Sequence, residues 1–482
     1  MFLGLDLGTS AVKALLADAD GNVVASRSAP LTVERPHHGW SEQDPESWWR
    51  ATQKSVAELK RENPSLLAAV QAIGLSGQMH GLTALDSAMK PLRPAILWND
   101  TRSAPQATRM DDAHPEFRAI GGNAVMPGFT APKAVWMSEH ESELFAATAM
   151  ILLPKDYLRL CLTGEAVSEM SDAAGTLWLD VGARDWSDRL LELCGLTRRQ
   201  MPRLVEGSAV SGRLREDIAK AWGIDGQPVV AGGGGDNAAA AAGLGVVAPG
   251  DSFLSLGTSG VVFTVTEKFA PAAESGAHAF CHAVPETWHQ MGVILAASDC
   301  VSWLCEVTGA DVDSLMQAFA RTDPAATDLM FHPYLSGERT PHNDANARGG
   351  FFGLARGHAQ GEMTRAVLQG VAFAIADATD VLRKAGAAPE RLLATGGGAK
   401  NEAWLSYIAA VTGIPIDMPA DGDFGAALGA ARLAMIADGA SVETVCHKPR
   451  IESTIEPDVA MAEALAPAYV RWRQIYRLLA DS

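Results

Sequence analysis

Leu7-Gly8-Thr9-Ser10-Ala11-Val12, close to the N-terminus, is repeated half a chain later as Leu256-Gly257-Thr258-Ser259-Gly260-Val261. Alternating apolar residues surround each copy, which predicts two strands joined by a Gly-Thr-Ser turn. Glycine lets the backbone approach a ligand closely, and neighbouring amides with two hydroxyls form a concave site for anionic oxygen. The pair therefore predicts a cleft in which a phosphate chain is held from both sides. Two ordinary hairpins are the alternative.

The residue before the glycine turn differs between the copies. Asp6 precedes the first copy, whereas Ser255 precedes the second. A carboxylate beside a phosphate site would repel the phosphate unless a cation lay between them. Asp6 therefore points to a magnesium ion, for which carboxylate oxygen is a suitable ligand.

The bulk composition indicates a globular protein of more than one domain. A chain of 482 residues is too long for a single core, and we predict domains at residues 1–245 and 246–482. The composition, 48% hydrophobic and 20% charged, is ordinary for globular proteins. A net charge of −18 argues against nucleic acid and anionic membrane as partners, because both require a basic surface.

The six cysteines lack the spacing of a disulfide framework, which predicts reduced thiols and a cytoplasmic protein. His278, Cys281 and His282 lack a second pair at zinc-ligand spacing, so we expect a structural or cleft-wall role for them. No signal peptide is evident. Residues 229–247 are apolar enough to suggest a membrane span, but polar residues and glycines at their centre argue against one.

Alternating strand and helix patterns predict α/β layers. We expect strands over residues 2–26 and 70–75, and helices over residues 45–60 and 363–383. Pro45 suits a first helical turn, with Ser41 or Asp44 as the expected cap. Each half has a hairpin early and a strand–glycine–helix unit later, which indicates duplication.

The first of these strand–glycine–helix units is Gly232-Gly233-Gly234-Gly235-Asp236-Asn237. A strand that ends in glycines and begins a helix presents free amides and its first side chains to a ligand. Asp236 would then reach a substrate hydroxyl as a general base. An aspartate that only caps the helix is the alternative.

The second unit, Gly396-Gly397-Gly398-Ala399-Lys400-Asn401, has the same form without an acid. It suits the sugar, base or α-phosphate of a nucleotide. It does not fit the Walker pattern, because Lys400 does not follow a glycine and no Ser or Thr comes next.

Polar side chains follow the strand over residues 70–75, where α/β proteins place ligand-binding groups. Gln78 and His80 are neutral hydrogen-bonding residues that suit sugar hydroxyls, and Trp98 is an apolar plate typical of carbohydrate clefts. A wall role for His80 and a purely structural pairing of Asp100 with Arg102 are the alternatives. The polar segment at residues 335–341 is interpreted as a hinge or gate, or as a plain surface loop.

Taken together, these residues resemble the FGGY family of carbohydrate kinases, and within it the kinases of xylulose, over nearly the whole chain. Two departures stand out: Ala134 where a bulkier apolar residue is usual, and one extra glycine before Asp236. The matching phrases include Asp6-Leu-Gly-Thr-Ser10, Trp40-Ser-Glu-Gln-Asp-Pro45, Gly77-Gln-Met-His80, Pro94-Ala-Ile-Leu-Trp-Asn-Asp100, Met126-Pro-Gly-Phe-Thr-Ala-Pro-Lys133, Gly235-Asp-Asn237 and Tyr334-Leu-Ser-Gly-Glu-Arg-Thr-Pro-His342.

The resemblance implies a two-domain α/β fold like that of actin, hexokinase and ribonuclease H, with the active site between the domains. It implies that Asp236 is the catalytic base and that Asp6 and Asp236 lie at Mg²⁺. The implied sugar-binding residues are Gln78, Met79, His80, Trp98, Asp236 and Asn237. The implied nucleotide-binding residues are Gly8, Thr9, Ser10, Lys13, Gly257, Thr258, Ser259, Gly397, Gly398 and Asn401.

The implied reaction is the phosphorylation of D-xylulose to D-xylulose 5-phosphate with ATP and Mg²⁺, and a homodimer is a further expectation. Kinases of ribulose, glycerol or gluconate are alternatives. Glycerol kinases carry an Arg-Glu pair where this chain has Met79-His80, and no cation for a gluconate carboxylate is evident at these positions. A nucleotide-gated sugar-binding protein without catalysis is the alternative from another class.

Overall fold

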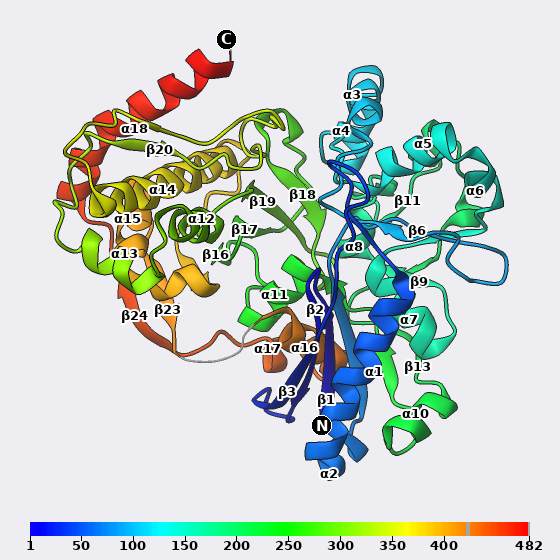
Figure 1. Cartoon of the computed structure of the whole chain (residues 1–482). Helices are drawn as coiled ribbons and strands as arrows, with labels where there is room; N and C mark the ends of the chain where they lie inside the picture. Colours follow the sequence, from blue (N-terminus) through cyan, green and yellow to red (C-terminus); the bar gives the residue numbers. More distant parts are fainter. Residues whose placement is uncertain (421–424, 481–482) are drawn as a thin grey trace.

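The computed structural model describes residues 1–420 and 425–480 of the chain. It has two lobes, each built on a mixed seven-stranded sheet, with the first lobe on the right of Figure 1 and the second on the left. The first sheet has the order β13 (Val210–Arg213), β14 (Val229–Ala231), β5 (Ala72–Gly77), β1 (Phe2–Leu7), β2 (Ala11–Ala17) and β3 (Val23–Pro30), and β15 (Gly234–Gly235) pairs with β5. The second has the order β18 (His278–Cys281), β19 (Trp288–Ile294), β17 (Gly260–Thr266), β16 (Ser252–Leu256), β22 (Leu392–Thr395), β23 (Ile416–Pro419) and β24 (Ile451–Ile455).

The repeated sequence forms the same hairpin in both sheets. β1 runs antiparallel to β2 and parallel to β5, and β16 runs antiparallel to β17 and parallel to β22. The Gly-Thr-Ser residues lie in the turn of each hairpin. The predicted strand–turn–strand units are confirmed, and the matching strand order supports the predicted duplication.

The predicted strand–glycine–helix units are also confirmed. β14 and the short β15 lead into α11 (Asp236–Leu244), and β22 leads through a 3-10 turn at Gly397–Lys400 into α15 (Glu402–Thr412). The helix expected at residues 45–60 is α1 (Pro45–Glu62), which Asp44 caps by accepting from the Glu46 amide at 3.0 Å. The helix expected at residues 363–383 is α14 (Gln360–Lys384).

One helix from late in the chain packs on the first lobe. α16 (Ala426–Ala437) lies against β1 and β5 and crosses α11. Glycines make these contacts close, since a Cβ on Gly4 would lie 1.9 Å from the Ala427 carbonyl oxygen, and one on Gly74 would lie 1.8 Å from that of Ala430. A Cβ on Gly429 would lie 1.7 Å from the Ala239 carbonyl oxygen. The sheet of the first lobe is therefore covered by a helix that comes from far along the sequence.

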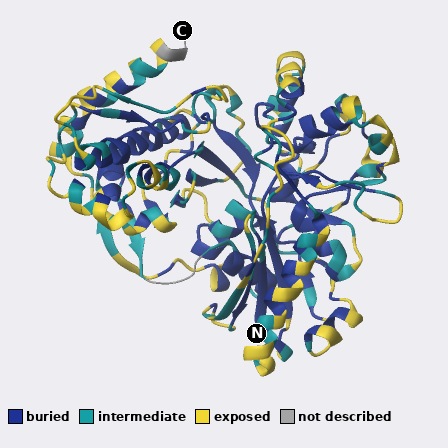
Figure 2. Ribbon diagram, in the orientation of Figure 1, coloured by how far each residue is buried: buried dark blue, intermediate teal, exposed yellow. Residues whose placement is uncertain are grey.

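Buried residues concentrate in the two sheets and in the helices packed on them (Figure 2). α14 covers β17 and β19 in the second lobe, and α1 covers β2 and β3 in the first. One apolar cluster joins the lobes, because Phe129 of the first lobe lies 6.2 Å from Phe280 of the second, ring centre to ring centre.

The remaining helices are α2 (Pro64–Ala68), α3 (Ala104–Ala113), α4 (Glu116–Gly121), α5 (Thr130–His140), α6 (Ser142–Ala147), α7 (Pro154–Thr163), α8 (Met170–Ala174), α9 (Asp188–Leu193), α10 (Glu216–Trp222), α12 (Ser298–Thr308), α13 (Val312–Phe319), α17 (Val442–Val445) and α18 (Val459–Ala480). The remaining strands are β4 (Glu42–Gln43), β6 (Thr83–Leu85), β7 (Ala95–Ile96), β8 (Met150–Leu152), β9 (Val167–Glu169), β10 (Leu179–Asp180), β11 (Asp185–Trp186), β12 (Arg203–Val205), β20 (Met330–His332) and β21 (Gly350–Phe352).

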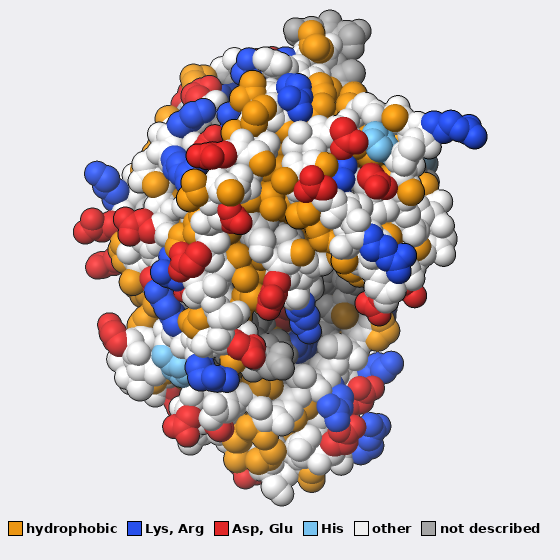
Figure 3. Space-filling model, turned by 90° about the vertical axis from the view of Figure 1, so that its left-hand side faces the viewer, with side chains coloured by type: hydrophobic (Ala, Val, Ile, Leu, Met, Phe, Trp, Pro, Cys, Tyr) orange, Lys and Arg blue, Asp and Glu red, His pale blue; other side chains and the backbone are white. Residues whose placement is uncertain are grey.

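Three observations bear on the predictions from composition. Among the helices of residues 1–420 and 425–480, none combines the length and the hydropathy of a membrane-spanning segment. All six cysteines are free thiols. Lys, Arg, Asp and Glu side chains are interspersed on the face shown in Figure 3.

Candidate active site

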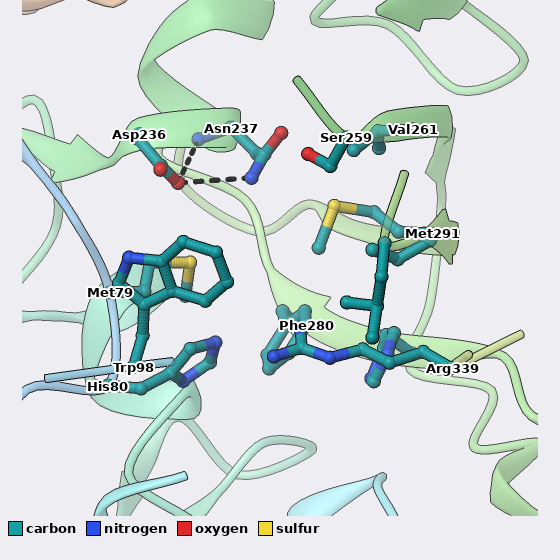
Figure 4. A pocket seen from close by; sticks show the side chains of 13 residues that line it. Met79, His80, Trp98, Asp236, Asn237, Ser259, Val261, Phe280, Met291 and Arg339 are labelled. Carbon is teal, nitrogen blue, oxygen red and sulfur yellow. Dashed lines mark hydrogen bonds between the residues drawn. The ribbon is translucent and has the colours of Figure 1, made fainter. Parts of the chain in front are cut away.

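A cavity lies between the lobes, at the ends of the strands that carry the predicted motifs (Figure 4). The first lobe contributes side chains from the end of β5, from Trp98 and from the start of α11, and the second contributes side chains from β17, β18 and β19. The lining residues are Met79, His80, Trp98, Asp236, Asn237, Ser259, Val261, His278, Phe280, Met291, Val293, Leu295 and Arg339.

Asp236 is the first residue of α11 and faces this cavity. Its Oδ1 accepts from the amide of Asn237 at 2.7 Å and from Asn237 Nδ2 at 3.0 Å. The helix cap is Gly235, and Asp236 makes no capping bond to the next turn, so the capping alternative is wrong. Burial, and then the negative charge of Asp6, raise the pKa of Asp236 to about 6. The Asp236 carboxylate is therefore mostly ionised at neutral pH and above.

Asp6 lies on β1, opposite Lys13 on β2 and beside Ser76 on β5. Its negative charge contributes to the raised pKa of Asp236, as expected when two carboxylates repel one another. Such a pair fits a divalent cation, and Mg²⁺ is commonly held by one or two carboxylates together with substrate phosphates. Among the described residues, no group of three or more His, Cys, Asp and Glu side chains could hold a metal by itself.

Hydrogen bonds connect the first hairpin turn to Gln78 and Trp98 of the first lobe. Thr9 Oγ1 donates to Gln78 Oε1 at 3.1 Å and accepts from Trp98 Nε1 at 2.9 Å. Gln78 Nε2 donates to Gln43 Oε1 at 3.0 Å. The amide of Gln78 is therefore engaged within the protein, and Gln78 does not line the cavity, unlike the other predicted sugar-binding residues.

The second hairpin turn lies beside the 3-10 turn at Gly397–Lys400. The amides of Ala297 and Ser298 donate to Thr258 and Gly257 at 2.8 and 2.9 Å. A Cβ on Gly398 would lie 3.0 Å from Leu256 Cβ, whereas one on Gly397 would meet no atom within 4 Å. Contacts within the protein therefore do not explain the glycine at position 397. A ligand that approaches the backbone closely at this position would explain it.

Asn401, the last predicted nucleotide-binding residue, caps a helix. Its Oδ1 accepts from the Trp404 amide at 3.0 Å, at the start of α15. The side chain therefore holds the glycine turn in place on α15.

His80 is held in an uncommon backbone conformation, with a φ of 67°. Its carbonyl accepts from Lys133 Nζ at 2.8 Å and from Thr130 Oγ1 at 3.1 Å, which stabilises this conformation. Its Nδ1 lies 2.7 Å from the carbonyl oxygen of Gly175. Burial lowers the pKa of His80 well below its usual value, so the ring is neutral at pH 7. Sequence reasoning missed the role of Lys133, which lies on α5, far from His80 in the chain.

The segment at residues 335–341 is not a plain surface loop. Glu338 and Thr340 are buried, and Glu338 Oε1 accepts from the Leu295 amide at 3.0 Å. Thr340 exchanges two 3.0 Å hydrogen bonds with Val293 at the end of β19. The hydroxyl of Thr340 also donates to the Gly276 carbonyl. The segment is therefore fixed to the second sheet.

Arg339, in this segment, lines the cavity and was missed from the sequence. The expectation that no cation lies near the sugar positions is therefore wrong. Arg339 belongs to the matching phrase at residues 334–342, but only the fold brings it opposite Trp98, over whose ring its guanidinium lies at 5.8 Å.

Asp100 and Arg102 have the structural role given as an alternative. Arg102 Nη2 lies 2.7 Å from Asp100 Oδ2, and Nη1 lies 2.7 Å from Glu42 Oε1. The guanidinium stacks 3.5 Å above the ring of Trp40. Both side chains are buried away from the cavity.

A buried polar network supports the backbone just before Asp236, and the sequence did not reveal it. The Gly235 amide donates to Ser171 Oγ at 3.0 Å, and that hydroxyl donates to Glu169 Oε2 at 2.8 Å. Lys155 Nζ lies 3.4 Å from Glu169 Oε1 and 3.4 Å from Asp172 Oδ2. All these side chains come from α7, α8 and the strand between them.

Known proteins resemble this chain over most of its length. The FGGY family of carbohydrate kinases matches with its N-terminal domain at residues 1–243 and with its C-terminal domain at residues 253–437. A xylulose kinase of Escherichia coli (strain K12) is 49% identical over 482 residues, covering 99% of each chain. The crystal structure of a "xyloylose kinase" from Brucella ovis is 52% identical with a TM-score of 0.96, covering 100% of this chain and 99% of that chain. A gluconate kinase structure from Lactobacillus acidophilus is 26% identical with a TM-score of 0.91, covering 100% and 98%.

Proposed function

Because the chain belongs to the FGGY family of carbohydrate kinases, we propose that it transfers the γ-phosphoryl group of ATP to the 5-hydroxyl of D-xylulose. The product is D-xylulose 5-phosphate. The observation that carries the proposal is the cavity between the lobes, with a buried carboxylate at one end and the neutral His80 ring and Arg339 at the other. Relatives named xylulose kinase, at 49% and 47% identity over 99% of the chain, favour this pentulose over other acceptors.

Asp236 is the proposed general base. Phosphoryl transfer through a loose transition state needs positioning and charge stabilisation more than a strong base. The bond from the γ-phosphorus to the ADP oxygen breaks, a bond to the sugar oxygen forms, and the hydroxyl proton passes to Asp236. Asn237 holds the carboxylate in one orientation through its two hydrogen bonds.

The two hairpin turns are the proposed holders of the phosphates, and Gly397 and Gly398 lie along the proposed nucleotide site. Asp6 and Asp236 are the proposed ligands of Mg²⁺, which would supply charge neutralisation for the phosphates. Their mutual repulsion in the absence of a cation supports this assignment.

Gluconate is the second candidate acceptor, because Arg339 places a cation in the cavity that could pair with a carboxylate. The structural similarity to a gluconate kinase is compatible with it. The far lower identity of that protein, 26% against 49% for the xylulose kinase, makes it the weaker proposal.

ADP release by the purified protein with Mg²⁺ and ATP tests the proposal. The acceptors to compare are D-xylulose, D-ribulose, L-ribulose, glycerol and gluconate. We expect D-xylulose to stimulate ADP release most strongly. Stronger stimulation by gluconate would show that gluconate, and not D-xylulose, is the acceptor, and would leave the fold assignment unchanged. No stimulation by any of the acceptors would contradict the proposed catalysis.

A further inference from the structure

The two ends of the cavity differ in chemistry. Asp236 and Asn237 lie at one end, and His80 and Arg339 lie at the other (Figure 4). Apolar side chains, among them Phe280, line the wall between them. The proposed phosphoryl transfer takes place at the first end and leaves the second end without an assigned partner on the sugar.

The histidines at the second end can only accept hydrogen bonds from a ligand. The partner of His80 Nδ1 is a carbonyl oxygen, so Nδ1 must carry the proton and Nε2 is an acceptor. His278 Nδ1 lies 2.9 Å from Asn123 Oδ1, whose amide nitrogen donates to two backbone carbonyls, so His278 also donates through Nδ1. Burial lowers the pKa of both histidines, which keeps both rings neutral.

Arg339 supplies the donors that this end otherwise lacks. Its Nη2 lies 3.1 Å from the position that a Cβ on Gly128 would occupy, and the carbonyl of Gly128 accepts from Lys133. Lys133 also donates to the carbonyl of His80, so the guanidinium and His80 share one corner of the cavity. Within the described part of the chain, no protein group accepts a hydrogen bond from this guanidinium. A cation in a cavity wall without such a partner favours an acceptor on the ligand.

The sugar of the proposed reaction carries a matching acceptor. In the furanose ring of D-xylulose, the 5-oxygen is bonded to C2, so only the open-chain ketone has a free 5-hydroxyl. A substrate whose 5-hydroxyl lies at Asp236 therefore presents a carbonyl at C2, near its opposite end. A carbonyl oxygen only accepts hydrogen bonds, and the histidines cannot donate to it.

We infer that Arg339 donates to the C2 carbonyl of the open-chain ketose and thereby determines specificity from the second lobe. The inference rests on the proposed function. The support of Arg339 is rigid, because Glu338 and Thr340 on either side are fixed to β19 and the residue that follows it. A rigid donor aimed at the carbonyl recognises ketoses over acceptors without oxygen at C2.

The test combines a residue change with a ligand change. Arg339→Met removes the donors and keeps much of the side-chain length, and exposed Arg348→Met is the control. The ligands are D-xylulose and 2-deoxy-D-threo-pentitol, which keeps the other four hydroxyls but has no oxygen at C2. Isothermal titration calorimetry gives the dissociation constants, and ADP release gives kcat and KM.

We expect Arg339→Met to weaken D-xylulose binding roughly 10- to 100-fold, the loss of one charge-assisted hydrogen bond. Binding of the deoxy ligand should change less than about threefold, since it lacks the acceptor. The unaltered protein should prefer D-xylulose by a similar roughly 10- to 100-fold factor. Arg339→Lys, which retains a donor, should restore part of the D-xylulose affinity.

Equal weakening of both ligands by Arg339→Met would overturn the inference and leave the proposed function standing. If Arg339→Met does not fold, equal affinity of the unaltered protein for both ligands would overturn it equally. Failure of the unaltered protein to turn over D-xylulose at all would instead overturn the proposed function, and the inference with it. Tighter binding of gluconate than of D-xylulose, lost in Arg339→Met, would assign Arg339 to a carboxylate and contradict the ketose assignment.

Discussion

The proposed role of Asp236 as general base can be tested by a substitution that keeps the shape of the side chain and removes the proton acceptor. Asp236→Asn keeps the side-chain outline, but the amide cannot take a proton. We expect turnover of D-xylulose to fall by at least about 10²–10⁴-fold, the usual contribution of a general base. The measurement is kcat from ADP release, with thermal unfolding to show that the fold persists. Asp217→Asn, at an exposed position on α10, is the control, and near-normal turnover of Asp236→Asn would contradict the assignment.

Glu338 makes the stability of the protein depend on pH. Burial raises the pKa of its carboxyl to about 8, against 4.5 for an unperturbed glutamate. Below about pH 4.5 the carboxyl is protonated in both the folded and the unfolded state, so it carries no penalty. As the pH rises toward 8, the unfolded state loses the proton that the folded state retains, so the folded state is progressively destabilised.

Glu338→Gln removes this titration and imitates the protonated side chain. We expect its free energy of unfolding, relative to the unaltered protein, to rise by up to about 1.4 kcal/mol per pH unit between these pKa values. Urea unfolding of both proteins at several pH values measures the difference, in which all other titrations cancel. A difference in the free energy of unfolding that does not vary with pH would contradict the raised pKa of the Glu338 carboxyl.

Residues whose role depends on their own strand or turn could be predicted from the sequence. The glycine turns and Met79-His80 follow strands directly, and Asp236 begins a helix after a run of glycines, so local pattern was sufficient. Lys133 and Arg339 act on groups that lie about 50 and more than 200 positions away in the chain. Linear spacing does not determine such contacts, and a basic residue in a polar phrase looks the same whether it faces solvent or a cavity.

At the scale of elements, α11 and α16 form a close contact between helices of the two halves. Gly429→Val would place side-chain carbon where the Ala239 carbonyl oxygen lies, so the helices must separate. We expect a loss of at least about 1–3 kcal/mol in the free energy of unfolding, as for other overpacked interiors. Chemical denaturation measures the loss. Gly357→Ala is the control, because a Cβ there meets no atom within 4 Å, and it should change the free energy of unfolding little. An equal loss of stability in both variants would contradict the close packing of α11 against α16.

Elements with strong periodicity were predictable, whereas burial of irregular segments was not. α14 and the two hairpins lie within a few residues of their predicted ranges. The segment at residues 335–341 looked like a hinge or surface loop because it is polar. Its glutamate and threonine bond backbone amides of β19 and the residue after it, and those partners are supplied by another part of the chain.

At the scale of the molecule, the cavity receives side chains from both lobes, so a bound sugar contacts both. Water in the place of the sugar cannot make these contacts. We expect ATP hydrolysis without sugar to be at least about 10²-fold slower than phosphoryl transfer, the usual cost of a misplaced nucleophile. ADP release with and without D-xylulose measures the ratio, and Asp236→Asn reports contaminating ATPase. A sugar-free rate close to the transfer rate would contradict this expectation.

The position of α16 has a consequence for the synthesis of the chain. β1 and β5 are made early, but the helix that covers them begins at Ala426. At a translation rate of about 5–20 residues per second, roughly 20–70 s separate β5 from its covering helix. During that interval one apolar face of the first sheet has no native partner, so the ribosome-bound chain is a substrate for chaperones that bind exposed hydrophobic surface. Truncated messages that end before this helix would yield aggregation-prone protein, not a free sugar-binding lobe.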